Sequence, residues 1–82
     1  MTTIEYRGAL TELCGRREEQ GSFAAVADVL RHVKTAYGAK AYKEAKKMLI
    51  TVDGTSILLL DKLKTRLQDG QKVSFLPICG GG

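Results

Sequence analysis

Alternating hydrophobic and polar residues predict β-strands near the start, the middle and the end of the chain. In the first of these segments Ile4 and Tyr6 lie on one side and Glu5 and Arg7 on the other, which is the period of a half-buried strand. A polar segment that follows a turn at Gly15 suits a thin, exposed edge strand. The strands expected from these patterns cover residues 3–10, 16–20, 48–52, 56–60 and 73–78.

Between the second and third strands, hydrophobic residues recur at three- and four-residue spacing, which is the period of an amphipathic helix. Ser22 suits the N-cap and Gly38 ends the pattern, so the main helix is expected between them. Residues 39–47 are good helix formers rich in lysine and predict a short, mostly solvated second helix. The apolar face of the main helix consists of Phe23, Val26, Ala27, Leu30, Val33 and Tyr37.

This order of elements predicts an α+β fold, with one main helix packed across a mixed four- to five-stranded sheet. The turn at Asp53-Gly54 joins two of the strands as a hairpin. The last strand is apolar on both faces, which favours a central position. Pro77 cannot donate a hydrogen bond to a neighbouring strand, so strand pairing should end there.

The chain is therefore expected to form one domain over residues 1–78 and a flexible glycine tail over residues 79–82. Glycines lose more backbone entropy on ordering than other residues, so such a tail adds no stability to the fold. When extended, the tail reaches about 13 Å, and its glycines fit a channel that is too narrow for other side chains. Such a tail can present its carboxylate inside a partner.

Composition and charge exclude few functions. A hydrophobic fraction of 44% and a charged fraction of 27% are typical of a globular domain. The net charge of +4 is compatible with an acidic protein, a nucleotide or a nucleic acid. However, the chain lacks the interleaved aromatic and basic residues of single-strand binders, so no nucleic-acid partner is expected. The sequence has no signal peptide and no long apolar run, so a cytoplasmic protein without a membrane partner is expected.

Few side chains suggest catalysis or metal binding. Cys14 and Cys79 cannot form a CxxC motif, and free thiols are expected rather than a disulfide. His32 has no second ligand in a recognisable motif, so we expect a solvated helical histidine. The basic residues are interpreted as solvated surface rather than docking patches: Lys40, Lys43, Lys46 and Lys47, and also Arg16, Arg17, Lys62, Lys64 and Arg66.

Residues 67–81, Leu-Gln-Asp-Gly-Gln-Lys-Val-Ser-Phe-Leu-Pro-Ile-Cys-Gly-Gly, resemble the C-terminal end of MoaD/ThiS-like sulfur carriers. The common pattern of that family is an Asp-Gly turn, a Val-x-Phe strand, a proline and a terminal Gly-Gly. The order of elements is similar to that of the ubiquitin-like β-grasp fold, and the length suits the small subunit of molybdopterin synthase. By spacing from Pro77 the last glycine of the family falls on Gly81, so Gly82 is an extra residue and either could be the working terminus.

The resemblance implies a carrier protein, not an enzyme, with no metal or cofactor of its own. In the family, a ubiquitin-activating-like adenylyltransferase (MoeB/ThiF-like) uses ATP and magnesium to adenylate the terminal glycine, and a persulfide donor supplies sulfur. The resulting thiocarboxylate passes its sulfur to the large subunit of molybdopterin synthase or to another sulfur-accepting enzyme. The resemblance implies that the sulfur-carrying terminus is formed by Gly80, Gly81 and Gly82, and that partners are contacted by Phe75, Pro77, Ile78 and Cys79.

Other interpretations of the same residues stay open. The protein could be a ubiquitin-like modifier attached through its glycine to lysines of targets, or a sulfur carrier for thiamine, cysteine or another metabolite. An adaptor or nucleic-acid-binding domain with an idle tail is the remaining class. Phe75 fits a purely structural core position equally well, and Cys79 also fits the role of a small apolar residue at a strand end.

Overall fold

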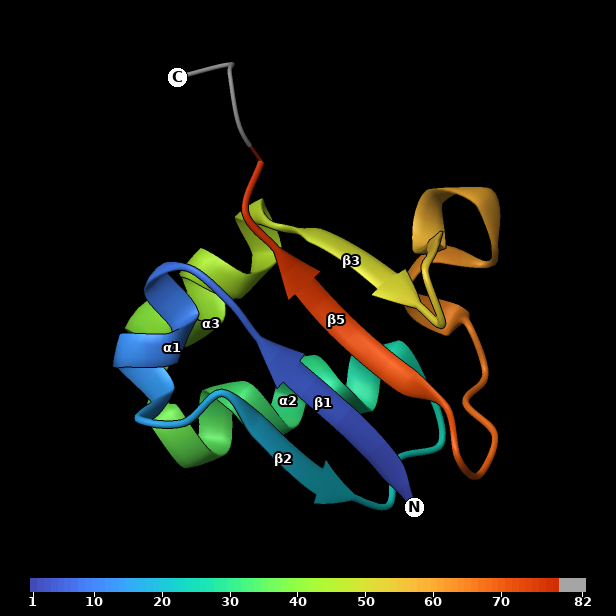
Figure 1. Ribbon diagram of the computed structural model, residues 1–82, viewed down its shortest axis with the longest axis horizontal. Helices are drawn as coiled ribbons and strands as arrows, with labels where there is room; N and C mark the ends of the chain where they lie inside the picture. The colour runs from blue at the N-terminus through green and yellow to red at the C-terminus, as the bar shows by residue number, and fades with distance from the viewer. Residues whose placement is uncertain (79–82) are drawn as a thin grey trace.

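The computed structural model describes residues 1–78, which form a five-stranded mixed sheet with helices packed on one face (Figure 1). The strands are β1 (Thr2–Tyr6), β2 (Glu18–Gly21), β3 (Leu49–Val52), β4 (Thr55–Ser56) and β5 (Lys72–Leu76). The helices are α1 (Ala9–Cys14), α2 (Val26–Tyr37) and α3 (Ala39–Lys47), with the short 3-10 helices η1 (Ile57–Leu59) and η2 (Lys62–Lys64).

The strand order is β2-β1-β5-β3-β4, in which β1 and β5 are parallel and the other neighbours are antiparallel. In Figure 1, α2 crosses behind β1 and β5, whereas α1 and α3 lie to the left. This arrangement confirms the expected β-grasp fold and the central position of the last strand. None of the helices within residues 1–78 is long and apolar enough to cross a membrane.

The core lies between α2 and the inner face of the sheet. Strand alternation turns Ile4 and Tyr6 of β1 and Val73 and Phe75 of β5 toward the helix, and all four are at most 1% exposed. Burial of side chains of this size contributes about 1.5–3 kcal/mol each, so both β1 and β5 are anchored firmly to the core. The helix contributes Val26, Val29, Leu30 and Val33 to the same core.

The first strand is shorter than expected, because residues 9–14 form helix α1. Gly8 turns the chain out of β1 with φ 59° and ψ −138°, and Gly15 ends the helix in the left-handed conformation. Leu10 and Cys14, one helical turn apart, are both buried. This spacing, together with the glycine at the C-terminal end, was the helix signal within the segment interpreted as strand and turn.

Two further boundaries differ from the sequence expectations. Helix α2 begins at Val26 and not after Ser22, because the backbone N–H of Ala25 donates to the carboxylate of Asp28 at 3.1 Å. The strand expected over 56–60 ends at Ser56, whose hydroxyl accepts a hydrogen bond from the N–H of Leu58 and so begins η1. The second helix is confirmed, although Ala41 and Ala45 pack one side of it into the core.

Glu19 on the edge strand β2 joins three elements through its carboxylate. Its Oε1 accepts hydrogen bonds from the hydroxyls of Tyr6 at 2.6 Å and Tyr37 at 2.8 Å. His32 Nε2 lies 3.1 Å from the same oxygen, and its ring packs against Phe23 and Tyr37. His32 is therefore partly buried, and the expectation of a solvated histidine was wrong. Sequence alone could not show this cluster, because its members come from β1, β2 and α2.

Two opposing effects set the pKa of Glu19. Burial raises it, whereas the hydrogen bonds from Tyr6 and Tyr37 and the contact with His32 lower it, and together these contacts hold the pKa below its ordinary value of 4.5. A depressed carboxyl pKa contributes stability that is present above the unfolded pKa and is lost as pH falls through the folded pKa.

We expect Glu19→Gln to destabilise the protein by about 1.5–3 kcal/mol at pH 7, since it removes a charged acceptor from hydrogen bonds with two tyrosines. The difference from the wild type should shrink as pH falls below the ordinary carboxyl pKa of 4.5, and the lowered pKa of Glu19 delays this loss to more acidic pH. Urea unfolding across this pH range measures both effects. Glu18→Gln, on the exposed side of the same strand, is the matched control, and equal losses in the two variants would contradict the prediction.

Gly8 lies against the point at which the chain leaves the sheet after β5. A Cβ atom added at Gly8 would lie 3.4 Å from Cγ of Pro77, so the turn after β1 packs directly against the residue that follows β5. Gly15 has a similarly positive φ of 71° but open space around it. The two glycines differ in two respects: Gly8 has a ψ of −138° and contacts Pro77, whereas Gly15 has a ψ of 18° in the left-handed region and no such contact.

We expect Gly8→Ala to cost about 2–3 kcal/mol, because its combination of φ 59° and ψ −138° is one that L-residues rarely adopt; the added Cβ would also come into van der Waals contact with Pro77. Gly15→Ala should cost about 1–2 kcal/mol from the left-handed conformation alone. Urea unfolding measures the costs, and the amide resonance of Ile78 should shift in the first variant only. Equal costs with an unmoved Ile78 resonance would show that the contact with Pro77 has no effect.

Candidate functional site

The chain leaves the sheet at the end of β5, in the middle of one edge of the molecule (Figure 1). Leu76 is paired with Leu49 of β3, and the neighbouring β1 ends at Tyr6, opposite Phe75. Strand pairing stops at Pro77, as its missing N–H predicts. Pro77 and Ile78 are both exposed, and Ile78 is 68% exposed. Two of the predicted partner-binding residues therefore lie on the surface.

Phe75, a third predicted partner-binding residue, is completely buried. Its ring stacks on that of Tyr6 with centroids 6.1 Å apart, on the face of the sheet covered by α2. The interpretation of Phe75 as a core residue is thus confirmed, and its side chain offers no surface for a partner in this structure. Its neighbours on the other face, Ser74 and Leu76, point away from the helix.

The remaining predicted residues lie outside the described part of the chain. These are Cys79, predicted to contact partners, and the sulfur-carrying terminus Gly80, Gly81 and Gly82, together with the flexibility expected of the tail. Their roles stay predictions.

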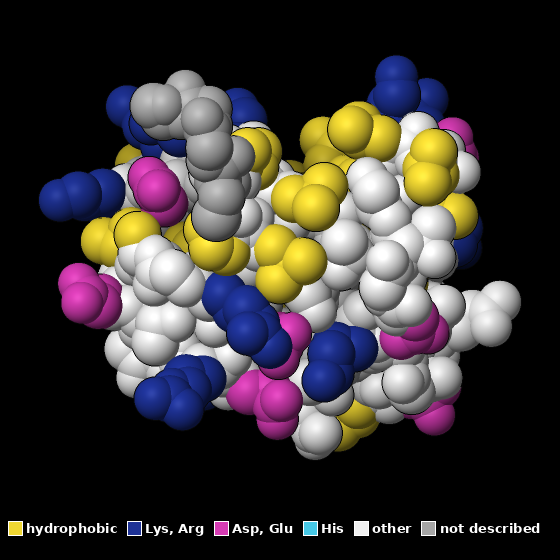
Figure 2. All heavy atoms as spheres, turned by 45° about the horizontal axis from the view of Figure 1, so that its top comes forward, with side chains coloured by type: hydrophobic (Ala, Val, Ile, Leu, Met, Phe, Trp, Pro, Cys, Tyr) yellow, Lys and Arg dark blue, Asp and Glu magenta, His cyan; other side chains and the backbone are white. Residues whose placement is uncertain are grey.

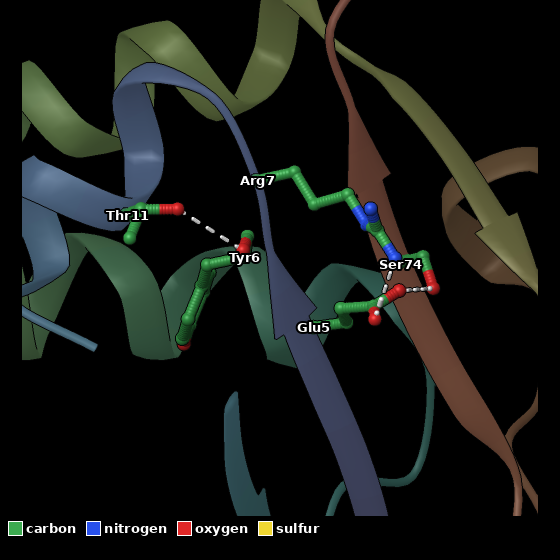
Figure 3. A network of polar contacts seen from close by, with 5 residues as sticks. All are labelled: Glu5, Tyr6, Arg7, Thr11 and Ser74. Carbon is green, nitrogen blue, oxygen red and sulfur yellow. Dashed lines mark hydrogen bonds and ion pairs between the residues drawn. The ribbon is translucent and has the colours of Figure 1, made fainter. Parts of the chain in front are cut away.

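A polar network lies beside the end of β5, on the face of the sheet without helices (Figure 3). The guanidinium of Arg7 donates to the carboxylate of Glu5 at 3.0 Å, and the hydroxyl of Ser74 donates to the same carboxylate at 2.9 Å. The hydroxyl of Thr11 donates to the carbonyl of Tyr6 at 3.2 Å. The hydrogen bonds from Arg7 and Ser74 hold the pKa of Glu5 below its usual value. The network thus brings together a carboxylate and a guanidinium that line the same hollow as Pro77.

These residues line a hollow that we call the exit groove, defined by Arg7, Gly8, Thr11, Arg17, Leu76 and Pro77. Its volume is about 740 Å³, and the acidic side chains of Glu5 and Glu18 complete its wall. Sequence analysis did not single out this groove, because it depends on the register that places Glu5 beside Ser74 in the parallel pair of β1 and β5. The outward positions of Glu5 and Arg7 in the alternating pattern were the only signal.

The described residues offer little for catalysis. Cys14 is a buried thiol in α1, and burial raises its pKa to about 11, so it is a poor nucleophile at neutral pH. Burial likewise raises the pKa of Tyr6, which donates to Glu19 inside the fold. Within residues 1–78 no three potential metal ligands come together. The arrangement is that of a rigid platform which presents the segment after β5.

Comparison with known families shows what this platform is. The family described as "ThiS family" matches residues 4–82. No curated protein sequence matches the chain. Among solved structures, small archaeal modifier protein 1 from Methanosarcina acetivorans is 25% identical and superposes with a TM-score of 0.84, over 99% of this chain and 95% of that one.

Two other solved structures share the fold at lower identity. A chain of the BexX/CysO complex of Amycolatopsis orientalis is 17% identical, with a TM-score of 0.83 and complete coverage of both chains. A putative molybdopterin converting factor subunit 1 from Pyrococcus furiosus is 21% identical, with a TM-score of 0.67 over 93% of this chain and 94% of that one. With the family match over nearly the whole sequence and a β-grasp fold whose buried central strand leads to the exposed Pro77 and Ile78, this chain belongs to the ThiS family.

Proposed function

We propose that the protein is a ubiquitin-like sulfur carrier whose C-terminal glycine is adenylated by a ubiquitin-activating-like enzyme and converted to a thiocarboxylate. The observation that carries the proposal is the family match through residue 82, combined with the exposed end of β5 at Pro77 and Ile78. The sequence after this point is Cys-Gly-Gly-Gly. Because glycine has no side chain, such a segment can enter a narrow enzyme channel.

The chemistry places all catalytic groups on partners. A carboxylate is a poor electrophile, so one of its oxygens first attacks the α-phosphate of ATP, and pyrophosphate leaves with its magnesium. The terminal sulfur of a persulfide donor then attacks the acyl-adenylate and displaces AMP. A second thiol cleaves the resulting acyl disulfide, forms a disulfide with the donor cysteine, and leaves the glycyl thiocarboxylate. In this proposal the carrier supplies only the acyl group, and the buried thiol of Cys14 takes no part.

The described residues contribute orientation. β5 is paired on both sides, so the backbone is fixed up to Leu76, and proline restricts φ at the next position. Pro77 packs against Gly8 and lines the exit groove, while the exposed side chain of Ile78 is free to contact an enzyme surface. A fixed point of departure lowers the entropy lost when a partner captures the segment that follows.

The accepting partner proposed is the large subunit of a molybdopterin synthase, in the cytoplasm. Support comes from the likeness to a putative molybdopterin converting factor subunit and from the length of the chain. Carriers for thiamine, cysteine or another sulfur metabolite use the same activation and differ only in the acceptor.

A ubiquitin-like modifier is the second candidate. It is favoured by the likeness to small archaeal modifier protein 1, which is 25% identical to this chain. Both functions begin with the acyl-adenylate, and they diverge in whether a sulfur or a lysine amine finally holds the glycine. The products therefore distinguish them.

We expect intact mass spectrometry of the protein from its own cells to show a gain of about 16 Da, because sulfur replaces one oxygen of the activated carboxylate. Tandem spectra of the C-terminal peptide should place the change on Gly81 or Gly82 and so identify the working terminus. A variant that lacks Gly80–Gly82 is the control and should show no gain. Unmodified termini together with branched peptides on lysines of other proteins would overturn the sulfur-carrier proposal in favour of the modifier.

A further inference from the structure

A second hollow lies on the other side of the exit point and differs in character from the exit groove. We call it the β3 groove and define it by Met48, Leu49, Ile50, Leu58, Leu63 and Ile78. Its volume is about 330 Å³, and its lining is mostly apolar. It lies between the end of α3, the start of β3 and the segment η1–η2, so α-helix, strand and 3-10 helices all contribute walls.

The groove exposes more apolar surface than folding requires. Leu58 is 69% exposed, Leu63 is 44% exposed and Ile78 is 68% exposed, although all three line the same hollow. Figure 2 looks onto the end of the molecule where β5 stops, and it shows hydrophobic side chains gathered there with Lys or Arg side chains on both flanks. Contiguous apolar patches of this kind on a small protein indicate a binding surface.

The rim of the groove is basic. Lys46 and Lys47 at the end of α3 belong to its wall. Lys62 and Lys64 do not line the hollow but are the sequence neighbours of Leu63 in η2, so they add positive charge to the same region. All four lysines are exposed, and within residues 1–78 none of them forms an ion pair.

The basic surface also extends beyond the groove. The ammonium groups of Lys34 and Lys46 lie 5.3 Å and 5.0 Å from the ring centroid of Tyr42, next to a smaller hollow that shares Leu63 with the β3 groove. Positive charge therefore surrounds the apolar floor on more than one side.

We infer that the β3 groove binds an acidic segment of a partner protein. Apolar side chains of that segment would fill the hollow between Leu58, Leu63 and Ile78, and its carboxylates would pair with Lys46 and Lys47, which line the wall. A concave hollow of limited volume suits protruding side chains better than a flat membrane surface. Its floor has no aromatic ring on which a nucleic-acid base could stack.

This surface shares no residue with the exit groove, although it includes Ile78, which the proposed function also offers to an enzyme. Peptide binding to it needs no activated glycine, so the inference does not rest on the proposed sulfur chemistry. Charged rims mainly accelerate encounter and select partners, whereas apolar anchors supply most of the affinity. The inference therefore predicts separate effects for the leucines and for the lysines. The chain offers a matched control for each.

The probe is a fluorescein-labelled peptide of about twelve residues with leucine and phenylalanine anchors among glutamates, measured by anisotropy with the full chain at low salt. The control peptide carries glutamine in place of glutamate. We expect the acidic peptide to bind at least about fivefold more tightly than the control, with amide shifts concentrated at residues 48–50 and 57–63. Deletion of Gly80–Gly82 should leave the affinity unchanged.

The leucine pair tests the floor of the groove. Leu58→Glu should weaken binding by at least about tenfold, which corresponds to about 1.4 kcal/mol. Leu59→Glu adds the same charge at the adjacent residue, which is 80% exposed and does not line the groove, so its affinity should stay within about twofold of the wild type.

The lysine pair tests the rim in the same way. Lys47→Glu should weaken binding by about threefold to tenfold, whereas Lys43→Glu, on the same helix but outside the groove, makes an equal change in net charge with a smaller effect.

Several outcomes would overturn the inference: equal weakening within either pair, amide shifts centred on another surface, or no binding up to about 1 mM peptide. Binding that is lost with Gly80–Gly82 would also overturn it, because the peptide would then occupy the exit site. Tight binding of phosphatidylserine vesicles without peptide binding would assign the surface to membranes. None of these results bears on the mass gain that tests sulfur carriage, so the two proposals fail separately.

Discussion

The insertion of β5 between β1 and β3 is the constraint on which the rest of the structure depends. It joins the two ends of the chain in one parallel pair, so every other element has to form within the loop that these strands close. Val73 and Phe75 then pack under α2, and the edge strand β2 is held in place by the carboxylate of Glu19. The same insertion fixes the point at which the chain leaves the sheet, so stability and function share one strand.

Most of this architecture follows from local patterns. The alternation in β1 and β3, the helical period of α2 and the apolar character of β5 each reflect burial on one or both faces, which the sequence records directly. Helix α1 escaped detection because six residues give too few turns to establish a period and because Ile4 and Tyr6 just before it suggest a continuing strand. The length of the strand after the hairpin turn was overestimated, because the hydroxyl of Ser56 accepts a hydrogen bond from the N–H of Leu58 and so begins a 3-10 helix in place of the strand. The hydrophobic pattern does not reveal such a hydrogen bond.

The functional surface was less predictable, because it depends on which residues the register brings together. Pro77 and the glycines marked the end of β5 in the sequence. Which of its last residues faces the core depends on the alternation of the strand in the folded sheet: Phe75 faces the core, whereas Leu76, one position later, faces outward. The partnership of Glu5 with Ser74 joins residues from opposite ends of the chain. The β3 groove has the same origin, since its walls come from α3, β3 and the 3-10 helices, each of which looks unremarkable alone.

The parallel pairing of β1 and β5 also places the beginning of the chain far from the site. The ammonium group of Met1 forms an ion pair with Asp69, and its carbonyl accepts a hydrogen bond from the N–H of Gly70, both just before β5 begins. In Figure 1 this corner lies at the opposite end of the sheet from the close of β5. A tag or fusion partner attached ahead of Met1 would therefore project away from both grooves, whereas one attached after the glycines would remove the free carboxylate. The fold thus separates an end suited to immobilisation from the end at which the proposed function needs a free carboxylate.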